Sequence, residues 1–128
     1  MGLQGRVLCP CCPKGMALEN LKIKLKCEDM IKYGYIALRQ FPKSEKFSLA
    51  QDIKKTMFSL LEKIIRTNRS RDKREALYAI DTELEILRTQ VRLAMELQFL
   101  PFAKYEVWGK HLAELGRMLG GWVKSIKG

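Results

Sequence analysis

A chain of 128 residues is the length of one domain, and its 47% of apolar residues is enough for a hydrophobic core, which excludes global disorder. The 24 basic and 14 acidic residues leave a net charge of +10, which attracts nucleic acid, an anionic membrane or an acidic protein. No apolar run reaches the ~18 residues of a membrane span, and the N-terminus lacks the apolar core of a signal peptide, so we expect a cytoplasmic protein with no membrane contact.

Residues 1–17 precede the first periodic segment and form an N-terminal tail. Met16 and Ala17 would begin the following helix cleanly, so a mis-assigned start stays open beside a true tail. The tail carries Cys9, Cys11 and Cys12, which are weak metal candidates, because a structural zinc site needs four ligands and no second cysteine pair follows. We therefore expect no metal and no cofactor within one chain, while zinc shared between chains stays open.

Four segments then space their apolar residues three and four apart, as amphipathic helices do: 18–41, 44–68, 72–99 and 102–126. The stripe residues are Cys27, Ile31, Gly34, Leu38 and Phe41 in the first segment; Ala50, Ile53, Met57, Leu60 and Ile64 in the second; Leu77, Ile80, Leu84, Leu87, Val91 and Ala94 in the third; and Tyr105, Trp108, Leu112, Leu115, Leu119, Trp122 and Ile126 in the fourth.

The breaks between the segments have recognisable signals. Pro42 and Pro101 end the first and third helices. Ser44 is the expected N-cap of the second helix, and Asp72 with Glu75 resembles a capping box for the third. Short connections make neighbouring helices antiparallel, so the sequence predicts an all-α, up-down-up-down four-helix bundle over residues 18–128.

Several features of the predicted helices lie off their stripes. The apolar residues among them predict either a wider core or a subunit interface; they are Phe58, Ile86, Leu93, Leu97, Val107 and Met118. Small residues recur along the last helix at Gly109, Ala113, Gly116 and Gly120, which favours close approach of another backbone over a flexible C-terminus.

The proposed topology gathers basic residues at one end of the bundle, where the first helix starts, the second meets the third and the fourth ends. They are Lys22, Lys24, Lys26, Lys63, Arg66, Arg69, Arg71, Lys73, Arg74, Lys124 and Lys127. A solvated helix end accounts for any single lysine, but like charges so close repel each other unless a counter-charge is present, so we favour a phosphate-binding surface. The opposite end carries fewer cations: Arg39, Lys43, Lys46 and Lys104.

One charged stripe on the third helix has two interpretations. Asp81, Glu85, Arg88 and Arg92 form either an intrahelical ion-pair ladder or a charged contact with a partner. Catalysis is not indicated, because the chain has one histidine, His111, and no glycine-rich phosphate loop or Glu-x-x-His pair. We expect no enzyme.

Three stretches resemble the accessory variability determinant (Avd) proteins of diversity-generating retroelements: FPKSEKFSLAQDIK at 41–54, ALYAIDTELEILRTQVRLAMEL at 76–97 and LAELGRMLGGWVKS at 112–125. The resemblance implies a basic four-helix bundle that assembles into a homopentameric ring, binds the retroelement reverse transcriptase and template RNA, and supports mutagenic retrohoming without being an enzyme. Arg88, Arg92 and Arg117 stand at basic positions of the family motifs, which implies partner or subunit contacts. Among the off-stripe apolar residues, Phe58, Ile86, Leu93 and Val107 are the predicted subunit interface.

Two alternatives remain at the level of sequence. The proteins encoded in intervening sequences of large-subunit rRNA share the fold and the PKSEKF stretch, so the chain also resembles that group. A basic protein-interaction module without nucleic-acid binding is the other alternative, in which the charged ends meet an acidic protein.

Overall fold

The computed structural model describes residues 18–127, and helices make up nearly all of this range. They are α1 (Leu18–Leu38), α2 (Leu49–Asn68), α3 (Arg74–Glu96) and α4 (Phe102–Lys127), with a short 3-10 helix, η2 (Lys43–Glu45), between α1 and α2. No strand occurs within residues 18–127. The tail with Cys9, Cys11 and Cys12 lies outside the described residues.

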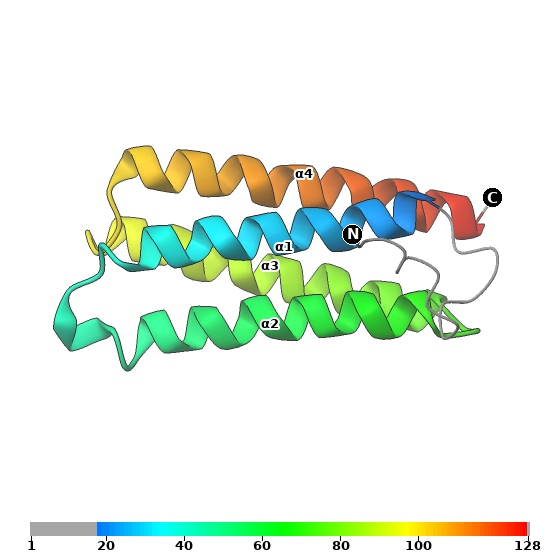
Figure 1. Cartoon of the computed structure of the whole chain (residues 1–128), viewed down its shortest axis with the longest axis horizontal. Coiled ribbons are helices and arrows are strands. Elements are labelled where there is room, and N and C mark those ends of the chain that lie inside the picture. The colour runs from blue at the N-terminus through cyan, green and yellow to red at the C-terminus, as the bar shows by residue number, and fades with distance from the viewer. Residues whose placement is uncertain (1–17, 128) are drawn as a thin grey trace, which may run out of the picture.

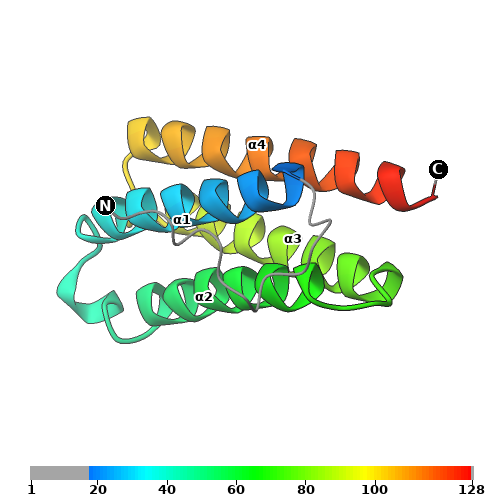
Figure 2. The ribbon, with the colours of Figure 1, turned by 45° about the vertical axis from the view of Figure 1, so that its right-hand side comes forward.

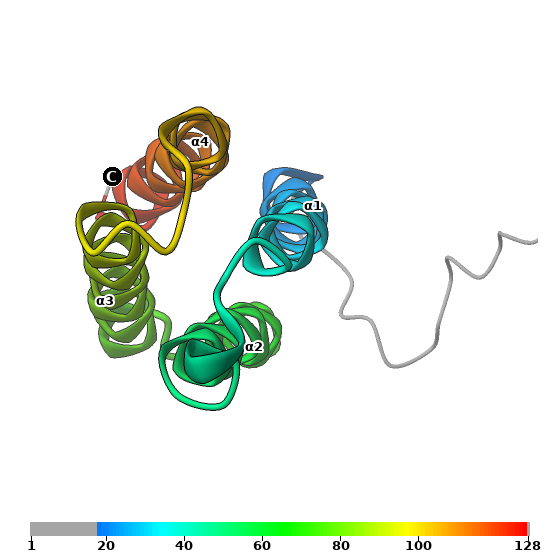
Figure 3. The ribbon, with the colours of Figure 1, turned by 90° about the vertical axis from the view of Figure 1, so that its left-hand side faces the viewer.

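The four helices form an antiparallel bundle in which each helix packs on two neighbours. α1 contacts α2 and α4, and α3 contacts the same two helices from the other side. Figure 1 shows successive helices running in opposite directions, and Figure 3, viewed along the bundle, shows them at the corners of a square. The predicted all-α, up-down-up-down bundle is confirmed.

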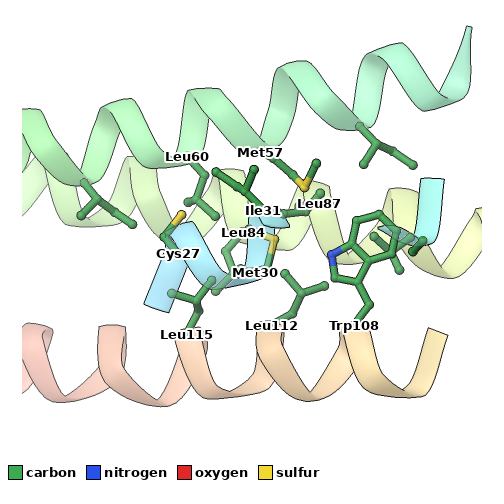
Figure 4. Packing of buried hydrophobic residues seen from close by; sticks show 14 of the residues in the cluster. Cys27, Met30, Ile31, Met57, Leu60, Leu84, Leu87, Trp108, Leu112 and Leu115 are labelled. Carbon is green, nitrogen blue, oxygen red and sulfur yellow. The ribbon is translucent and has the colours of Figure 1, made fainter. Parts of the chain in front are cut away.

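The predicted stripes form the core of this bundle. Every stripe residue of the first three helices is buried, and in α4 only Tyr105 and Ile126 are partly exposed. Figure 4 shows Cys27, Met30, Met57, Leu87 and Trp108 meeting between the helices. Met118 also packs against the core, so the stripe of α4 is wider than its three-and-four spacing, whereas the other off-stripe apolar side chains remain exposed.

Two predicted helix starts are wrong. Ser44 lies in η2, and α2 begins five residues later at Leu49, because the segment after Pro42 forms turns of its own before the helix starts. Asp72 is not the N-cap of α3: the cap position is Lys73, and the Asp72 carboxylate accepts a 3.3 Å hydrogen bond from the Arg74 N–H. Local side-chain bonds of this kind compete with regular capping.

α3 ends at Glu96, three residues before the predicted end. Gln98 has a φ of 68°, the left-handed conformation that usually requires glycine. The Phe99 N–H donates to the Ala94 carbonyl and the Gln98 N–H donates to the Met95 carbonyl, the bond pair of a Schellman motif. The Phe99 ring then lies 6.0 Å from that of Phe41, which joins the two connections at this end of the bundle.

The tightest point of the core is where α1 crosses α2 and α4. A Cβ atom on Gly34 would lie 2.6 Å from Met57 Sδ and 2.9 Å from Trp108 Cζ2. Trp108 is completely buried, so its ring cannot move aside into solvent. Gly34 is therefore required for the closeness of these three helices.

We predict that Gly34→Ala lowers the free energy of unfolding by about 1–3 kcal/mol, because overpacking outweighs the gain in helix propensity. Gly121→Ala is the matched control: no atom lies within 4 Å of the added methyl group, so we expect a gain of up to ~1 kcal/mol. Chemical denaturation followed by circular dichroism measures both. A Gly34→Ala protein as stable as the wild type would contradict the packing described here.

Candidate nucleic-acid interface

The turn between α2 and α3, residues 69–73, lies beside the last turns of α4. Arg71, Lys73 and Arg74 line a hollow of about 420 Å³, with Asp72, Glu75 and, from α4, Ile126. Leu77 and Tyr78 of α3 also meet Val123 and Ile126 of α4. Figures 1 and 2 show this turn and the end of α4 at the same end of the bundle, which we call the turn end. Segments some 50 residues apart in the sequence thus meet here.

Hydrogen bonds within the turn hold its backbone in place. The Ser70 hydroxyl donates to the Asp72 carbonyl over 2.9 Å, and the Lys73 ammonium donates to the Ser70 carbonyl over 2.6 Å. Arg71 and Arg74 are exposed and form no ion pair with a described residue. The turn therefore presents two free guanidinium groups on a fixed backbone, which suits binding of phosphate oxygens.

Three of the predicted cations are instead paired with carboxylates. Lys24 lies 2.6 Å from Glu28, and Arg66 lies 2.9 Å from Glu62, both as i,i+4 pairs. Lys63 reaches across from α2 to Glu83 of α3, at 3.3 Å. These carboxylates offset the three positive charges, so the three residues add less to the attraction of an anion than their number suggests.

Lys26 lies along the side of the bundle rather than at the turn end. Burial first, and then the charge of Lys26, lowers the pKa of His111 in α4, whose ring stacks on Tyr33 at 5.5 Å. Arg117 lowers the pKa of Glu114 most, and Lys26 lowers it further. Glu114 precedes the end of α4 by 13 residues, or ~20 Å, which places Lys26 well away from the turn.

The remaining predicted cations lie in the α2–α3 turn or near the start of α1 and the end of α4. Lys22, in the second turn of α1, and Lys124, in α4, are exposed and form no ion pair with a described residue. Arg69 is exposed in the turn and has an interaction of its own. Lys127 is the last residue of α4, and its side chain lies outside the described part. The turn end thus carries fewer free cations than the predicted eleven.

The charged stripe of α3 does not form the expected ladder. Arg88 donates a 3.4 Å hydrogen bond to the Leu112 carbonyl of α4, and its guanidinium lies where a side chain at Gly116 would have to go. Arg92 pairs with Glu96 at 3.1 Å, and Arg117 pairs with Glu114. Neither Asp81 nor Glu85 forms an ion pair with a described residue. The ladder is therefore absent, and Arg88 joins α3 to α4.

A groove of about 330 Å³ runs between α3 and α4 beside this contact. Arg88 and Arg92 line one wall, and Gly109 and Ala113 line the other. A methyl group added at Gly109 or Gly120 would meet no atom within 4 Å. In the row of small residues, Gly116 therefore makes room for the Arg88 side chain, whereas Gly109 and Gly120 leave open surface. No other backbone of the described residues packs closely against these glycines.

The predicted apolar interface residues lie on the surface of the bundle. Phe58, Ile86, Leu93 and Val107 are 40% to 50% exposed. Phe58 contacts Tyr35 edge-on at 6.3 Å, and a shallow hollow runs beside it past Leu61 and Ile65. Apolar side chains are thus exposed on α2, α3 and α4.

Two observations concern the possible metal ligands and the thiol in residues 18–127. This range holds no group of three or more His, Cys, Asp or Glu side chains placed to hold a metal ion. Cys27 is buried, which raises the pKa of its thiol to about 12, so it is protonated and unreactive at neutral pH. No helix in this range is long and apolar enough to cross a membrane.

Comparison with protein families gives a match over nearly the whole bundle. The profile of a family described as bAvd-like covers residues 21–126, which spans α2 and α3 completely and nearly all of α1 and α4. The chain belongs to the bAvd-like family. This confirms the resemblance to accessory variability determinant proteins that the three sequence stretches predicted. A search of curated proteins gives no match.

Membership of the bAvd-like family supports an accessory role of the Avd type. That family is in general a non-catalytic, accessory one. The residues that carry the role in this chain are not assigned by the family match, so they have to be argued from the geometry above.

Proposed function

We propose that this bAvd-like protein is a non-catalytic accessory subunit of a diversity-generating retroelement, which binds the reverse transcriptase and the template RNA and supports mutagenic retrohoming. The observation that carries the proposal is the meeting of the α2–α3 turn with the end of α4. It brings Arg71 and Arg74 close to the segment that bears Lys124.

The RNA contact is made mainly with phosphates. Free guanidinium and ammonium groups at the turn end neutralise backbone charges and release counterions, which gives affinity without sequence preference. Trp122, the indole nearest the end of α4, is buried and cannot stack on a base. The net charge of +10 adds long-range attraction to any polyanion.

The protein contacts are made by the sides of the bundle. Phe58 on α2 and Ile86 and Leu93 on α3 offer apolar area, and the groove beside Arg88 and Arg92 offers charge-assisted hydrogen bonds. These surfaces bind further copies of the chain, in a homopentamer by likeness to the family, and the reverse transcriptase.

The RNA contact is tested by the salt dependence of binding. We expect the triple variant Arg71→Gln, Arg74→Gln and Lys124→Gln to reduce the slope of log K against log salt by about 0.7–0.9 for each phosphate that is no longer neutralised, or roughly 2–3 in all. The measurement is filter binding of template RNA between about 50 and 200 mM salt, the range over which such slopes are usually resolved.

The matched control removes the same charge from the sides of the bundle, by Lys32→Gln, Lys55→Gln and Lys110→Gln, all at exposed positions. It should change the slope much less than the triple variant. An unchanged slope in the triple variant would remove the turn end from the RNA site and would favour a protein-interaction module.

The protein contacts are tested with Ile86→Glu combined with Leu93→Glu, which places two charges on the exposed apolar surface of α3. We expect the wild type to be an oligomer by light scattering at micromolar concentration and the double variant to dissociate, because buried unpaired carboxylates are costly. Gln40→Glu with Gln51→Glu is the control, with the same charge change at exposed polar positions. A monomeric wild type would contradict this assignment.

Binding of the reverse transcriptase is tested separately, by its capture on this protein after RNase treatment.

A further inference from the structure

The end of the bundle opposite the turn carries the most exposed aromatic ring among the described residues. Phe47, in the connection between α1 and α2, is 91% exposed. This connection and the one between α3 and α4 lie together at what we call the loop end, at the left of Figure 1 and facing the viewer in Figure 3. No helix stripe includes Phe47, so the spacing of apolar residues gave no indication of its exposure.

The loop end also carries four cations without ion pairs to described residues: Arg39, Lys43, Lys46 and Lys104. The first three lie within the same connection as Phe47 and are exposed. The nearest acid in the chain, Glu45, accepts a 2.7 Å hydrogen bond from the Ser48 hydroxyl. An exposed ring thus lies among cations that remain available to an anion.

The backbone that holds Phe47 is well ordered by hydrogen bonds. The N–H groups of Glu45, Lys46 and Ser48 donate to the carbonyls of Pro42, Lys43 and Glu45, over 2.9 to 3.2 Å. Phe41, just before Pro42, is buried and lies against Phe99 from the other connection. The ring is thus presented on a fixed turn, which reduces the entropy that a ligand would have to overcome.

We propose that the loop end binds single-stranded nucleic acid, with one base stacked on the Phe47 ring and neighbouring phosphates held by Arg39, Lys43 and Lys46. Exposed aromatic rings beside cations are the usual elements of single-strand binding, because every base offers a π face and every linkage a charge. The class of ligand rests on the proposed RNA-binding function, whereas the site is separate from the turn end.

The distance between the two ends makes their contributions separable. α2 alone, with 20 residues at ~1.5 Å each, spans ~30 Å between the loop end and the turn. One nucleotide cannot reach both ends, so the turn end holds phosphates while the loop end adds base stacking on unpaired segments. An anionic membrane suits the site less well, because η2 has only three residues and forms no amphipathic helix to lie in the interface.

The test uses the full-length chain with Phe47→Trp. The native indoles of Trp108 and Trp122 are 0% and 6% exposed, so the added indole reports on the loop end. We expect an unstructured oligouridine to quench its fluorescence and an RNA duplex of the same length to leave it unchanged. Leu25→Trp, on the side of α1 at a half-exposed position, is the matched control and should not be quenched.

Affinity gives the second readout. Phe47→Ala and Phe47→Leu should both weaken oligouridine binding about 5- to 150-fold, the effect expected for removing one base stacked on an aromatic ring. Both changes are at an exposed turn, so the fold is retained. Equal binding by the wild type and Phe47→Ala, or no quenching of the Phe47→Trp indole, would overturn the proposal.

The remaining outcomes identify other occupants. Quenching by anionic phospholipid vesicles but not by oligouridine would overturn the proposal in favour of a membrane surface. Loss of reverse transcriptase capture by Phe47→Ala with unchanged oligouridine binding would overturn it in favour of a protein pocket. The salt dependence of template RNA binding by the turn-end triple variant is measured independently. If that variant has a reduced slope while oligouridine does not quench the Phe47→Trp indole, the loop-end proposal is wrong and the turn-end proposal stands.

Discussion

The arrangement depends on the mutual burial of four apolar stripes in antiparallel register. In the part of the core nearer the loop end, Met57 of α2 and Trp108 of α4 pack on Gly34 of α1, a position with no room for a methyl group. Figure 4 shows the Met57 and Trp108 side chains between the helices. The Arg88 contact with the Leu112 carbonyl and Gly116 joins α3 to α4 in the same way. These contacts set how far each helix is shifted along its neighbours. They therefore also set which turns and helix ends lie together at each end of the bundle.

The fold and the placement of acids together decide where positive charge is free. Carboxylates on the helix sides pair with Lys24, Lys63 and Arg66. Arg71 in the turn and Arg74 at the start of α3 form no ion pair with a described residue. The loop end likewise leaves Lys43 and Lys46 without such a pair. Unpaired cations therefore lie at both ends of the bundle, and the exposed Lys32, Lys55 and Lys110 lie along its sides beside the apolar area. In the proposed function, the ends of the bundle bind RNA and the apolar sides bind proteins.

The sequence predicted the helices and their buried faces well because apolar spacing repeats over several turns in each helix. Helix ends were harder to predict. Ser44 looks like a cap but lies in η2, Asp72 looks like a cap but accepts a local bond from the Arg74 N–H, and Gln98 adopts a conformation usually marked by glycine. Contacts between helices could not be predicted. Nothing in the sequence pairs Lys63 with Glu83, places Lys26 beside Glu114 or directs Arg88 to Gly116, because these depend on how each helix is rotated and shifted against its neighbour.

Hydrogen exchange of the full-length chain, measured by mass spectrometry with and without template RNA, tests most directly whether distant segments form one RNA-binding surface. The arrangement predicts that RNA slows exchange in residues 69–76 and in residues 119–126 at the same RNA concentration, because the two segments share one end of the bundle. Slower exchange in only one of these segments, or protection confined to the middle of the helices, would contradict it.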